Sequence, residues 1–225
     1  MLNLQEMLTT FGLENAPRFT ICDAAEFQDA HVPPFSVDLP VLLRGVEKQD
    51  LIKIQQVLQT IYSDAHPVRV ANANNNVTNV NLGLLGAKEL DVPVSAIYIP
   101  PLETGTSLTA FQEIVAHLRA PDGCPWDRKQ THQSLRQHLL EESYEALAAM
   151  DANNPAGMAE EFGDLLLQIV LNAQIASESK AFTMNDIIRG IYDKIVRRHP
   201  HVFGETEVDG VGQVLKNWEQ LKEQE

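Results

Sequence analysis

The sequence has 225 residues, of which 44% are hydrophobic and 21% are charged, and its formal net charge is −14. This length suggests one large or two small domains, and the composition is that of a globular protein rather than a disordered one. The negative charge disfavours non-specific binding to nucleic acid polymers or to an anionic membrane. It does not exclude a nucleotide, because a metal ion and a few basic residues can reverse the field inside a cleft.

The two cysteines, Cys22 and Cys124, lie in different regions of the chain, which is typical of a protein of the reducing cytoplasm. The amino terminus has no basic segment followed by an apolar run, so no signal peptide is predicted. No uninterrupted apolar run approaches the roughly 20 residues of a membrane span. These features together predict a cytoplasmic protein that does not enter a membrane.

Residues 1–107 are predicted to form a small α+β domain. Residues 47–62 have the apolar spacing of an amphipathic helix. Short segments rich in branched and aromatic residues are predicted strands at 18–22, 40–43, 66–70, 77–82 and 94–99. This region has no glycine-rich phosphate loop and no cluster of histidines and cysteines with metal-ligand spacing. We therefore expect it to be structural.

The polar segment Glu103–Leu108 is the best domain boundary, and residues 108–225 are predicted to form an all-α helical bundle. Thr183 is a predicted cap for one of its helices, with Asp186 in the first turn. The expected helices are 110–119, 132–151, 156–178, 184–198 and one starting near 211.

Acidic residues dominate the middle of this helical region. Between Gln137 and Ser179 there is no lysine or arginine, and most of the acids form two groups, E-E-S-Y-E at 141–145 and E-E-F-G-D at 160–164. Helical spacing places Glu141, Glu142 and Glu145 on one arc, and Glu161 and Asp164 on another. Acid groups often simply face solvent, and the first group is compatible with that interpretation.

The second group favours a metal site over a solvated face. It precedes residues 165–176, which are apolar nearly all round, so this helix is expected to be buried. Its polar positions, Asp164, Gln168 and Asn172, recur every four residues and extend the stripe that Glu161 begins. A short turn at 153–155 would pack the two acidic helices antiparallel. Buried carboxylates without basic neighbours require a cation, and a hard divalent metal fits.

The motifs of residues 108–225, in their order, resemble the MazG family. They are Gly123–Asp127 with Gln130-Thr131, E-E-x-x-E at 141–145, E-x-x-D at 161–164, R-R-H-P-H-V-F-G at 197–204 and Asn217–Lys222. MazG proteins are all-α nucleoside triphosphate pyrophosphohydrolases, which cleave between the α and β phosphates with Mg²⁺. The resemblance implies hydrolysis of nucleoside triphosphates to monophosphate and pyrophosphate in control of the nucleotide pool.

The resemblance also implies roles for the acids. Glu142, Glu145, Glu161 and Asp164 would bind Mg²⁺, with Mn²⁺ as an alternative ion. Glu141 or Glu160 would orient or deprotonate the attacking water, and the sequence does not choose between them.

Several other residues are candidates for substrate binding. Lys194 and Arg198 lie four residues apart on one helix face and suit the triphosphate, with Arg197 and Lys222 as further cations. The alternative is that the pair ends a helix in solvent, where cations suit the dipole. Trp126 and Trp218 would stack on a base or anchor the core. Asn172 is expected to contact substrate or a metal-bound water. His138 precedes Glu142 by one turn, where relatives place a basic residue.

Residues 35–102 resemble the second half of a tetrapyrrole methylase domain. Leu39–Leu43, Asp64–Val68 and Ile97–Leu102 carry this resemblance. The half with that family's glycine-rich cofactor loops has no counterpart, so residues 1–107 are interpreted as a non-catalytic remnant for oligomerisation or docking.

One prediction and two alternatives concern the whole molecule. The apolar surface left on 165–176 predicts a homodimer, which the MazG resemblance also implies, with substrate near the interface. A related all-α pyrophosphohydrolase acting on dUTP or phosphoribosyl-ATP would share the fold. A non-catalytic nucleotide-binding regulatory module is disfavoured, because such a module does not need this many metal ligands.

Overall fold

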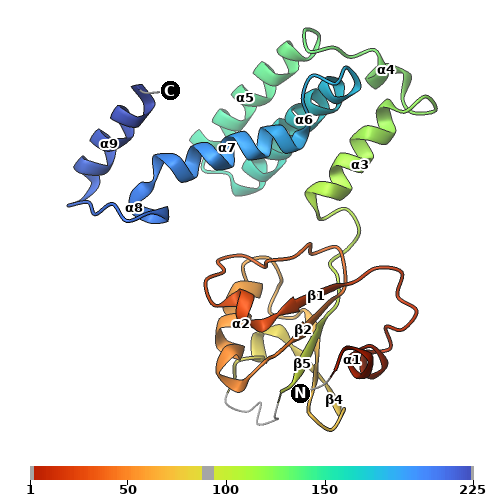
Figure 1. Ribbon diagram of the computed structural model, residues 1–225. Helices are drawn as coiled ribbons and strands as arrows, with labels where there is room; N and C mark the ends of the chain where they lie inside the picture. Colours follow the sequence, from red (N-terminus) through yellow and green to blue (C-terminus); the bar gives the residue numbers. More distant parts are fainter. Residues whose placement is uncertain (1–2, 88–93, 224–225) are drawn as a thin grey trace. The chain divides into compact units, whose positions relative to one another are not determined.

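The computed structural model describes residues 3–87 and 94–223. The chain divides into two compact units, Met1–Phe111 and Gln112–Glu225 (Figure 1). Within the described residues, no helix is long and apolar enough to cross a membrane.

The first unit is built on a five-stranded sheet with the strand order β1-β2-β5-β3-β4. Strand β1 is parallel to β2 and the other neighbouring strands are antiparallel, with Val41 opposite Ile99 and Val70 opposite Ile97. The strands are β1 (Thr20–Asp23), β2 (Val41–Arg44), β3 (Pro67–Ala71), β4 (Val77–Asn81) and β5 (Ala96–Ile99).

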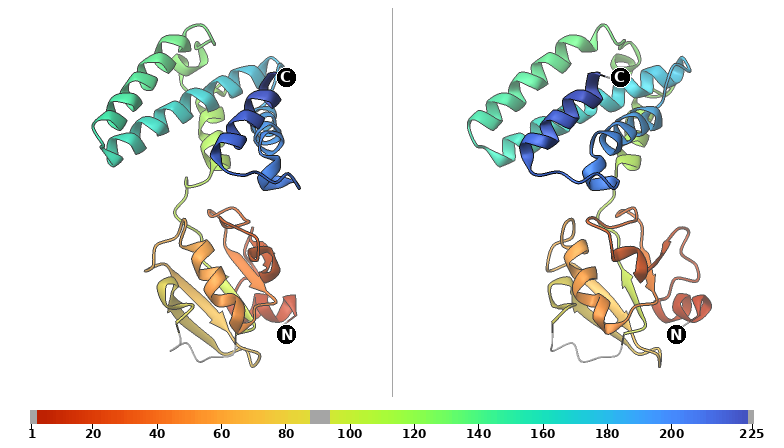
Figure 2. Two further views of the ribbon diagram at one scale, coloured as in Figure 1. Left: turned by 90° about the vertical axis from the view of Figure 1, so that its left-hand side faces the viewer. Right: turned by 60° about the vertical axis from the view of Figure 1, so that its left-hand side comes forward.

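Helices cover both faces of this sheet, as Figures 1 and 2 show. Because successive strand residues point to opposite faces, Leu42 joins one core cluster while Val41 and Leu43 join the other. The first cluster lies under α1 (Leu4–Phe11) and the second under α2 (Leu51–Leu58). The short 3-10 helices are η1 (Ala24–Phe27), η2 (Lys48–Asp50) and η3 (Leu82–Leu84).

The predicted mixed α and β character of this unit is confirmed, with small shifts at the strand ends. The helix expected at 47–62 is shorter, because its first turn is the 3-10 helix η2 and α2 ends at Leu58. Helix α1 was not predicted. Its signal is a capping box in which Asn3 and Glu6 each accept a hydrogen bond from the other's backbone N–H, at 2.9 and 2.8 Å.

The second unit is helical, as predicted. Its elements are α3 (Leu108–Arg119, which begins in the first unit), α4 (Pro125–Arg128), α5 (Leu135–Asp151), α6 (Pro155–Glu178), α7 (Met184–Arg198), α8 (Pro200–Phe203) and α9 (Val211–Glu223). The predicted bounds of α7 are confirmed, and Thr183 and Asp186 form its capping box. Helix α5 begins three residues later than expected, after a turn in which Thr131 and Ser134 exchange hydrogen bonds.

Helices α5 and α6 form the antiparallel pair that the sequence predicts, lying side by side in both figures. The connection is short because Asn153 adopts a left-handed conformation with φ 48°. The Asn154 side chain then accepts from the Gly157 N–H and caps α6, with Pro155 in its first turn.

Arg119 joins three segments of the second unit. Its guanidinium pairs with both carboxylate oxygens of Glu178 at 2.7 Å, which links α3 to the end of α6. It also donates to the backbone oxygens of Asp127 and Gln130. The turn between α3 and α4 lies tightly against α3. A Cβ atom at Gly123 would therefore overlap the carbonyl oxygens of His117 and Leu118. This turn therefore requires glycine.

The expectation that residues 165–176 are buried all round is wrong for the single chain. One side of α6 is buried, at Val170, Leu171, Ala173 and Ala176. The other side is open, with Leu166 39% and Ile169 43% exposed. The four-helix unit is too small to cover a whole helix circumference, so an apolar face remains on the surface.

Candidate functional site

Three carboxylates from the α5–α6 pair form the candidate metal centre. One oxygen each from Glu142, Glu145 and Glu161 lies within 4.8 Å of the other two. Glu142 and Glu145 are three residues apart on α5, so both lie on the side that meets α6. Two of the three are half-buried and Glu145 is exposed. The packing of the two helices therefore converts two separate acidic groups into one cluster.

The cluster is electrostatically strained. Partial burial is the main cause that raises the pKa of the Glu142 carboxyl above its usual range. The negative charges of Asp164, Glu145 and Glu141 raise this pKa further, whereas His138 lowers it. Partial burial also raises the pKa of Glu161, together with the charges of Glu145, Glu160, Asp164 and Glu142. Neighbouring negative charges favour the protonated form of each carboxyl, and a bound cation would relieve them.

Asp164 lies beside this cluster, and its oxygens are not among those within the 4.8 Å limit. Its charge is nevertheless the largest charge effect on Glu142. The sequence predicted four ligands, and the structure brings together three of them with Asp164 as a close neighbour.

The cluster fits a hard divalent ion. Mg²⁺ binds oxygen ligands at about 2.1 Å, so oxygens on opposite sides of the ion are about 4.2 Å apart. Because this is the largest separation between two ligands of one ion, the limit of 4.8 Å between the three carboxylates is close to what such an ion needs, and carboxylates supply the oxygen atoms that Mg²⁺ and Mn²⁺ prefer. Glu142, Glu145 and Glu161 would hold such an ion, and Asp164 is a charged neighbour of Glu142.

Glu141, Glu160 and two ring side chains surround the cluster. Glu141 accepts a hydrogen bond from Gln137 at 2.9 Å and lies 3.4 Å from the Nδ1 atom of His138. The Trp126 ring meets the His138 ring edge-on, with centroids 6.2 Å apart. Trp126 is 57% exposed, so the core-anchor interpretation of this residue is wrong in the single chain. Glu160 is exposed at the α6 side of the cluster.

Asn172 lies two turns beyond Asp164, as predicted, and it is held in place by two hydrogen bonds. Its Nδ2 atom donates to the backbone oxygen of Gln168 at 2.8 Å, so its Oδ1 atom faces the Nδ1 atom of His132 at 2.7 Å. Sequence reasoning assigned no role to His132. The contact spans forty positions along the chain, and no periodicity within one helix reveals such a pairing.

The candidate cations lie on α7 and α9. Lys194 is exposed on α7 and Lys222 is exposed on α9. The Arg198 guanidinium lies over the Trp218 ring, 5.9 Å from its centroid, which brings two predicted substrate residues together. Trp218 is 40% exposed. The carboxylate cluster forms without any of these side chains.

Comparison with known proteins identifies the class of this site. Residues 130–203 match the model of the MazG nucleotide pyrophosphohydrolase domain, and this match contains the whole carboxylate cluster. This part of the chain is therefore a MazG domain, as the motifs predicted.

Similar proteins come from several bacteria. A segment of 136 residues is 48% identical to the uncharacterized protein YabN of Bacillus subtilis, covering 59% of this chain and 28% of that protein. A segment of 123 residues is 50% identical to the nucleoside triphosphate pyrophosphohydrolase/pyrophosphatase MazG of Thermotoga maritima, covering 55% and 47%. The nucleoside triphosphate pyrophosphohydrolase of Escherichia coli K12 is 44% identical over 113 residues, covering 50% and 43%. The chain thus spans less than half the length of each of these relatives.

Proposed function

We propose that this protein hydrolyses nucleoside triphosphates to nucleoside monophosphate and pyrophosphate and thereby removes excess or unwanted nucleotides in the cytoplasm. The observation that carries this proposal is the meeting of Glu142, Glu145 and Glu161 inside the MazG domain. The names of the Thermotoga maritima and Escherichia coli relatives support the same activity.

The carboxylates of α5 and α6 hold a divalent metal in this proposal, with Asp164 as fourth ligand. Mg²⁺, or Mn²⁺ in its place, supplies charge neutralisation for the triphosphate when it is bound. Lys194 and Arg198 bind phosphate oxygens, with Arg197 and Lys222 as further cations. Trp126 or Trp218 covers a face of the base.

The reaction requires a water molecule directed at the α phosphorus. Glu141 or Glu160 orients this water and accepts its proton as the new P–O bond forms, and the bond to the β-phosphate oxygen breaks to release pyrophosphate. Glu141 is already oriented by Gln137 and His138, whereas Glu160 is exposed. Comparing Glu141→Gln with Glu160→Gln decides between them, because the base is the residue whose loss removes turnover without weakening metal binding.

For the first unit we propose a non-catalytic role as a docking or oligomerisation module related to the tetrapyrrole methylase fold. Several of its acids are engaged in local structure. Glu6, Asp23 and Asp50 take part in helix capping, and Asp38 accepts hydrogen bonds from Ser36 and Ser107. Binding of S-adenosylmethionine to the protein would contradict this interpretation.

Product analysis tests the proposed reaction. The full chain is incubated with Mg²⁺ and a panel of ribo- and deoxyribonucleoside triphosphates that includes dUTP, with phosphoribosyl-ATP as a further substrate. We expect monophosphate and pyrophosphate in equal amounts, or their equivalents from phosphoribosyl-ATP. Release of nucleoside diphosphate and inorganic phosphate would contradict cleavage between the α and β phosphates. Binding of nucleotides without turnover would favour the regulatory module.

A further inference from the structure

A pocket of about 370 Å³ lies between α5, α6 and the start of α7, within the second unit. Its lining combines apolar side chains, among them Leu139, Phe182 and Ile187, with the polar side chains of His132, Arg136, Gln168 and Asn172. Its volume lies within the range of about 300–1,000 Å³ that is typical of small-molecule sites.

The pocket begins one helical turn from Glu142 on α5 and two helical turns from Glu161 on α6. On α5, Leu139 precedes Glu142 by three residues, and on α6, Gln168 follows Asp164 by four. Because α5 and α6 are antiparallel, Leu139 and Gln168 are displaced from these acids in the same direction along the helix pair. One turn corresponds to about 5 Å along the axis. A ligand whose phosphates lie at the carboxylates can therefore extend its other end into this pocket.

Gln168 is an unusual side chain for this position. It is only 6% exposed, and its Oε1 atom is buried without a hydrogen-bond partner among the described residues. Buried polar atoms in native proteins are nearly always hydrogen-bonded, so an orphaned acceptor indicates a missing donor. The donor is expected from a ligand that carries N–H groups.

The polar and aromatic groups around Gln168 are fixed. Asn172 is held between His132 and the Gln168 backbone, as described above. The His132 and Phe182 rings are stacked, with centroids 6.5 Å apart and planes 20° apart. The pocket therefore offers flat apolar surfaces together with one free amide, a combination that suits a planar heterocycle.

We propose that this pocket binds the nucleobase of the substrate and that the Gln168 amide recognises the hydrogen-bonding edge of the base. The inference rests on the proposed function, because the phosphates of the substrate lie at the carboxylate cluster. A side-chain amide both donates and accepts, as the edge of a base requires. An apolar side chain from a second copy of the chain would fill the volume but leave the Gln168 acceptor unpaired.

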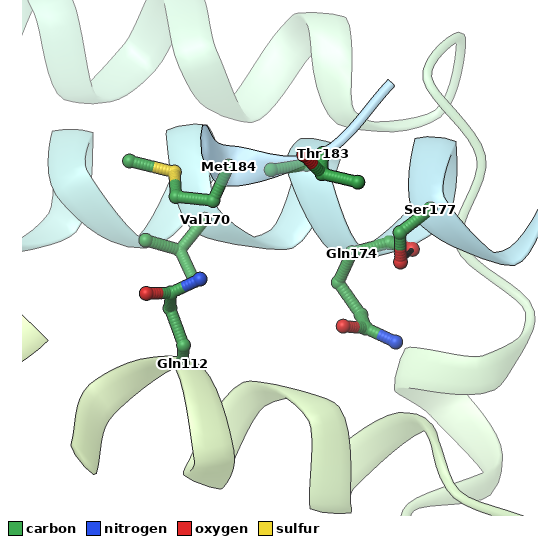
Figure 3. Close-up of a pocket in the computed structure, with 7 residues that line it drawn as sticks. Gln112, Val170, Gln174, Ser177, Thr183 and Met184 are labelled. Carbon is green, nitrogen blue, oxygen red and sulfur yellow. Dashed lines mark hydrogen bonds between the residues drawn. The ribbon is translucent and has the colours of Figure 1, made fainter. Parts of the chain in front are cut away.

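A smaller cavity of the same unit provides a contrast. It has a volume of about 110 Å³ and lies between α3, α6 and the start of α7 (Figure 3). Three of its polar lining residues are already engaged, because Ser177 donates to the Gln174 backbone, Gln174 donates to Glu178 and Thr183 donates to Asp186. It is too small for a nucleoside. Its Gln112 therefore serves as a matched control position for Gln168.

The test measures binding of the four ribonucleoside monophosphates to the full chain by calorimetry with Mg²⁺, alongside kcat/KM for the four triphosphates. Gln168→Leu should weaken monophosphate binding roughly tenfold and reduce the differences between bases. Ile187→Trp, which fills the pocket from α7, should also weaken binding. Gln112→Leu should leave binding unchanged. Gln168→Glu removes the amide donor, so it should raise the preference for CTP over UTP.

Two results would overturn the inference. Monophosphate binding that is absent in the parent protein, or equal in the parent and Gln168→Leu, would mean that the base lies elsewhere. A change in the monomer–dimer equilibrium without a change in binding would assign the pocket to a partner chain. If the parent protein hydrolyses no triphosphate but binds monophosphates through Gln168, the proposed reaction fails while the base site stands.

Discussion

The carboxylates of Glu142, Glu145 and Glu161 repel one another, and this repulsion is the main residue-scale feature of the site. Each is a normal exposed or half-buried helix residue by itself. Within this cluster, partial burial and the neighbouring charges of Glu145 and Asp164 raise the pKa values of Glu142 and Glu161. Carboxyl groups with raised pKa values that gather in one place are typical of functional sites rather than of residues that serve stability.

Replacing one of these acids by its amide tests their role. Glu142→Gln, Glu145→Gln, Glu161→Gln and Asp164→Asn should each lower kcat/KM for a nucleoside triphosphate by about a hundredfold or more, because a metal ligand is lost. The melting temperature without metal should be equal or higher, since repulsion is removed. Asp151→Asn, at the end of α5 outside the cluster, is the matched control. Near-normal activity in the four variants would return these acids to a solvated-face interpretation.

The Arg119–Glu178 pair has the opposite electrostatic character. Hydrogen bonding from Arg119 lowers the pKa of Glu178 below its usual value of 4.5. A carboxylate with a lowered folded-state pKa stabilises the protein above the unfolded-state pKa and loses that contribution as the pH falls through the folded-state pKa.

Glu178→Gln should therefore destabilise the protein at pH 7, because the ion pair with Arg119 is lost. The expected loss is only about 1 kcal/mol, since Glu178 is partly exposed and solvent screens the pair. The difference from the parent protein should shrink as the pH falls below about 4.5. Thermal unfolding of both proteins across this pH range measures it. Equal stability at pH 7 would show that Arg119 is held by its backbone contacts alone.

At the scale of elements, the packing of α5 against α6 is coupled to the proposed metal site. In the observed packing the acids of the two helices meet, so their repulsion opposes it without a metal, and a metal that binds the folded pair would stabilise it. The capped turn at 153–155 fixes which residues face one another.

Mg²⁺ should consequently raise the melting temperature in a concentration-dependent way without nucleotide. At a hundredfold excess over the dissociation constant the gain is about 2.7 kcal/mol for one site. Calorimetric scans with increasing Mg²⁺ measure the effect, and Glu161→Gln should reduce it. A melting temperature indifferent to Mg²⁺ would mean that substrate phosphates are needed to complete the site.

At the scale of the whole molecule, the second unit contains the complete carboxylate cluster and the Gln168 pocket. The Arg119–Glu178 ion pair, which links α3 to the end of α6, joins two residues of this same unit. The first unit has its own two-sided core.

Deleting residues 1–107 should therefore leave a folded, active helical fragment whose kcat/KM is within a few-fold of the full chain. Circular dichroism and the product assay measure this, with the Glu142→Gln fragment as the inactive control. A folded fragment without activity would show that the first unit completes the site.

The exposed apolar face of the second unit argues for self-association. Large side chains on α5, α6 and α7 are about half exposed or more: Leu140 56%, Tyr144 64%, Leu147 53%, Phe162 49%, Ile191 50% and Tyr192 66%. Leu140, Tyr144 and Leu147 recur at helical spacing on α5, and exposed large apolar side chains in such a stripe mark an interaction site.

Sedimentation velocity should show a homodimer at micromolar concentration. A charged replacement within the α5 stripe, such as Tyr144→Glu, should shift the protein towards monomer. Asp151→Asn again serves as the control. A monomer in the parent protein would mean that another partner covers this face.

Local physics in the sequence determined much of this protein. Helical spacing placed the acids on two helices, the Asn154-Pro155 start positioned α6, and the Thr183 cap fixed the beginning of α7. These features depend on residues within a turn or two of one another, so a sequence read alone reveals them.

Only the tertiary structure decided which of these residues meet. The His132–Asn172 bond and the Arg119–Glu178 pair join residues 40 and 59 positions apart, and helical periodicity carries no information on such pairings. The sequence also could not reveal the orphaned acceptor of Gln168 or the open side of α6. Both depend on how many neighbours reach a helix after folding, and the hydrophobic pattern of a single helix is the same whether a neighbour covers it or not.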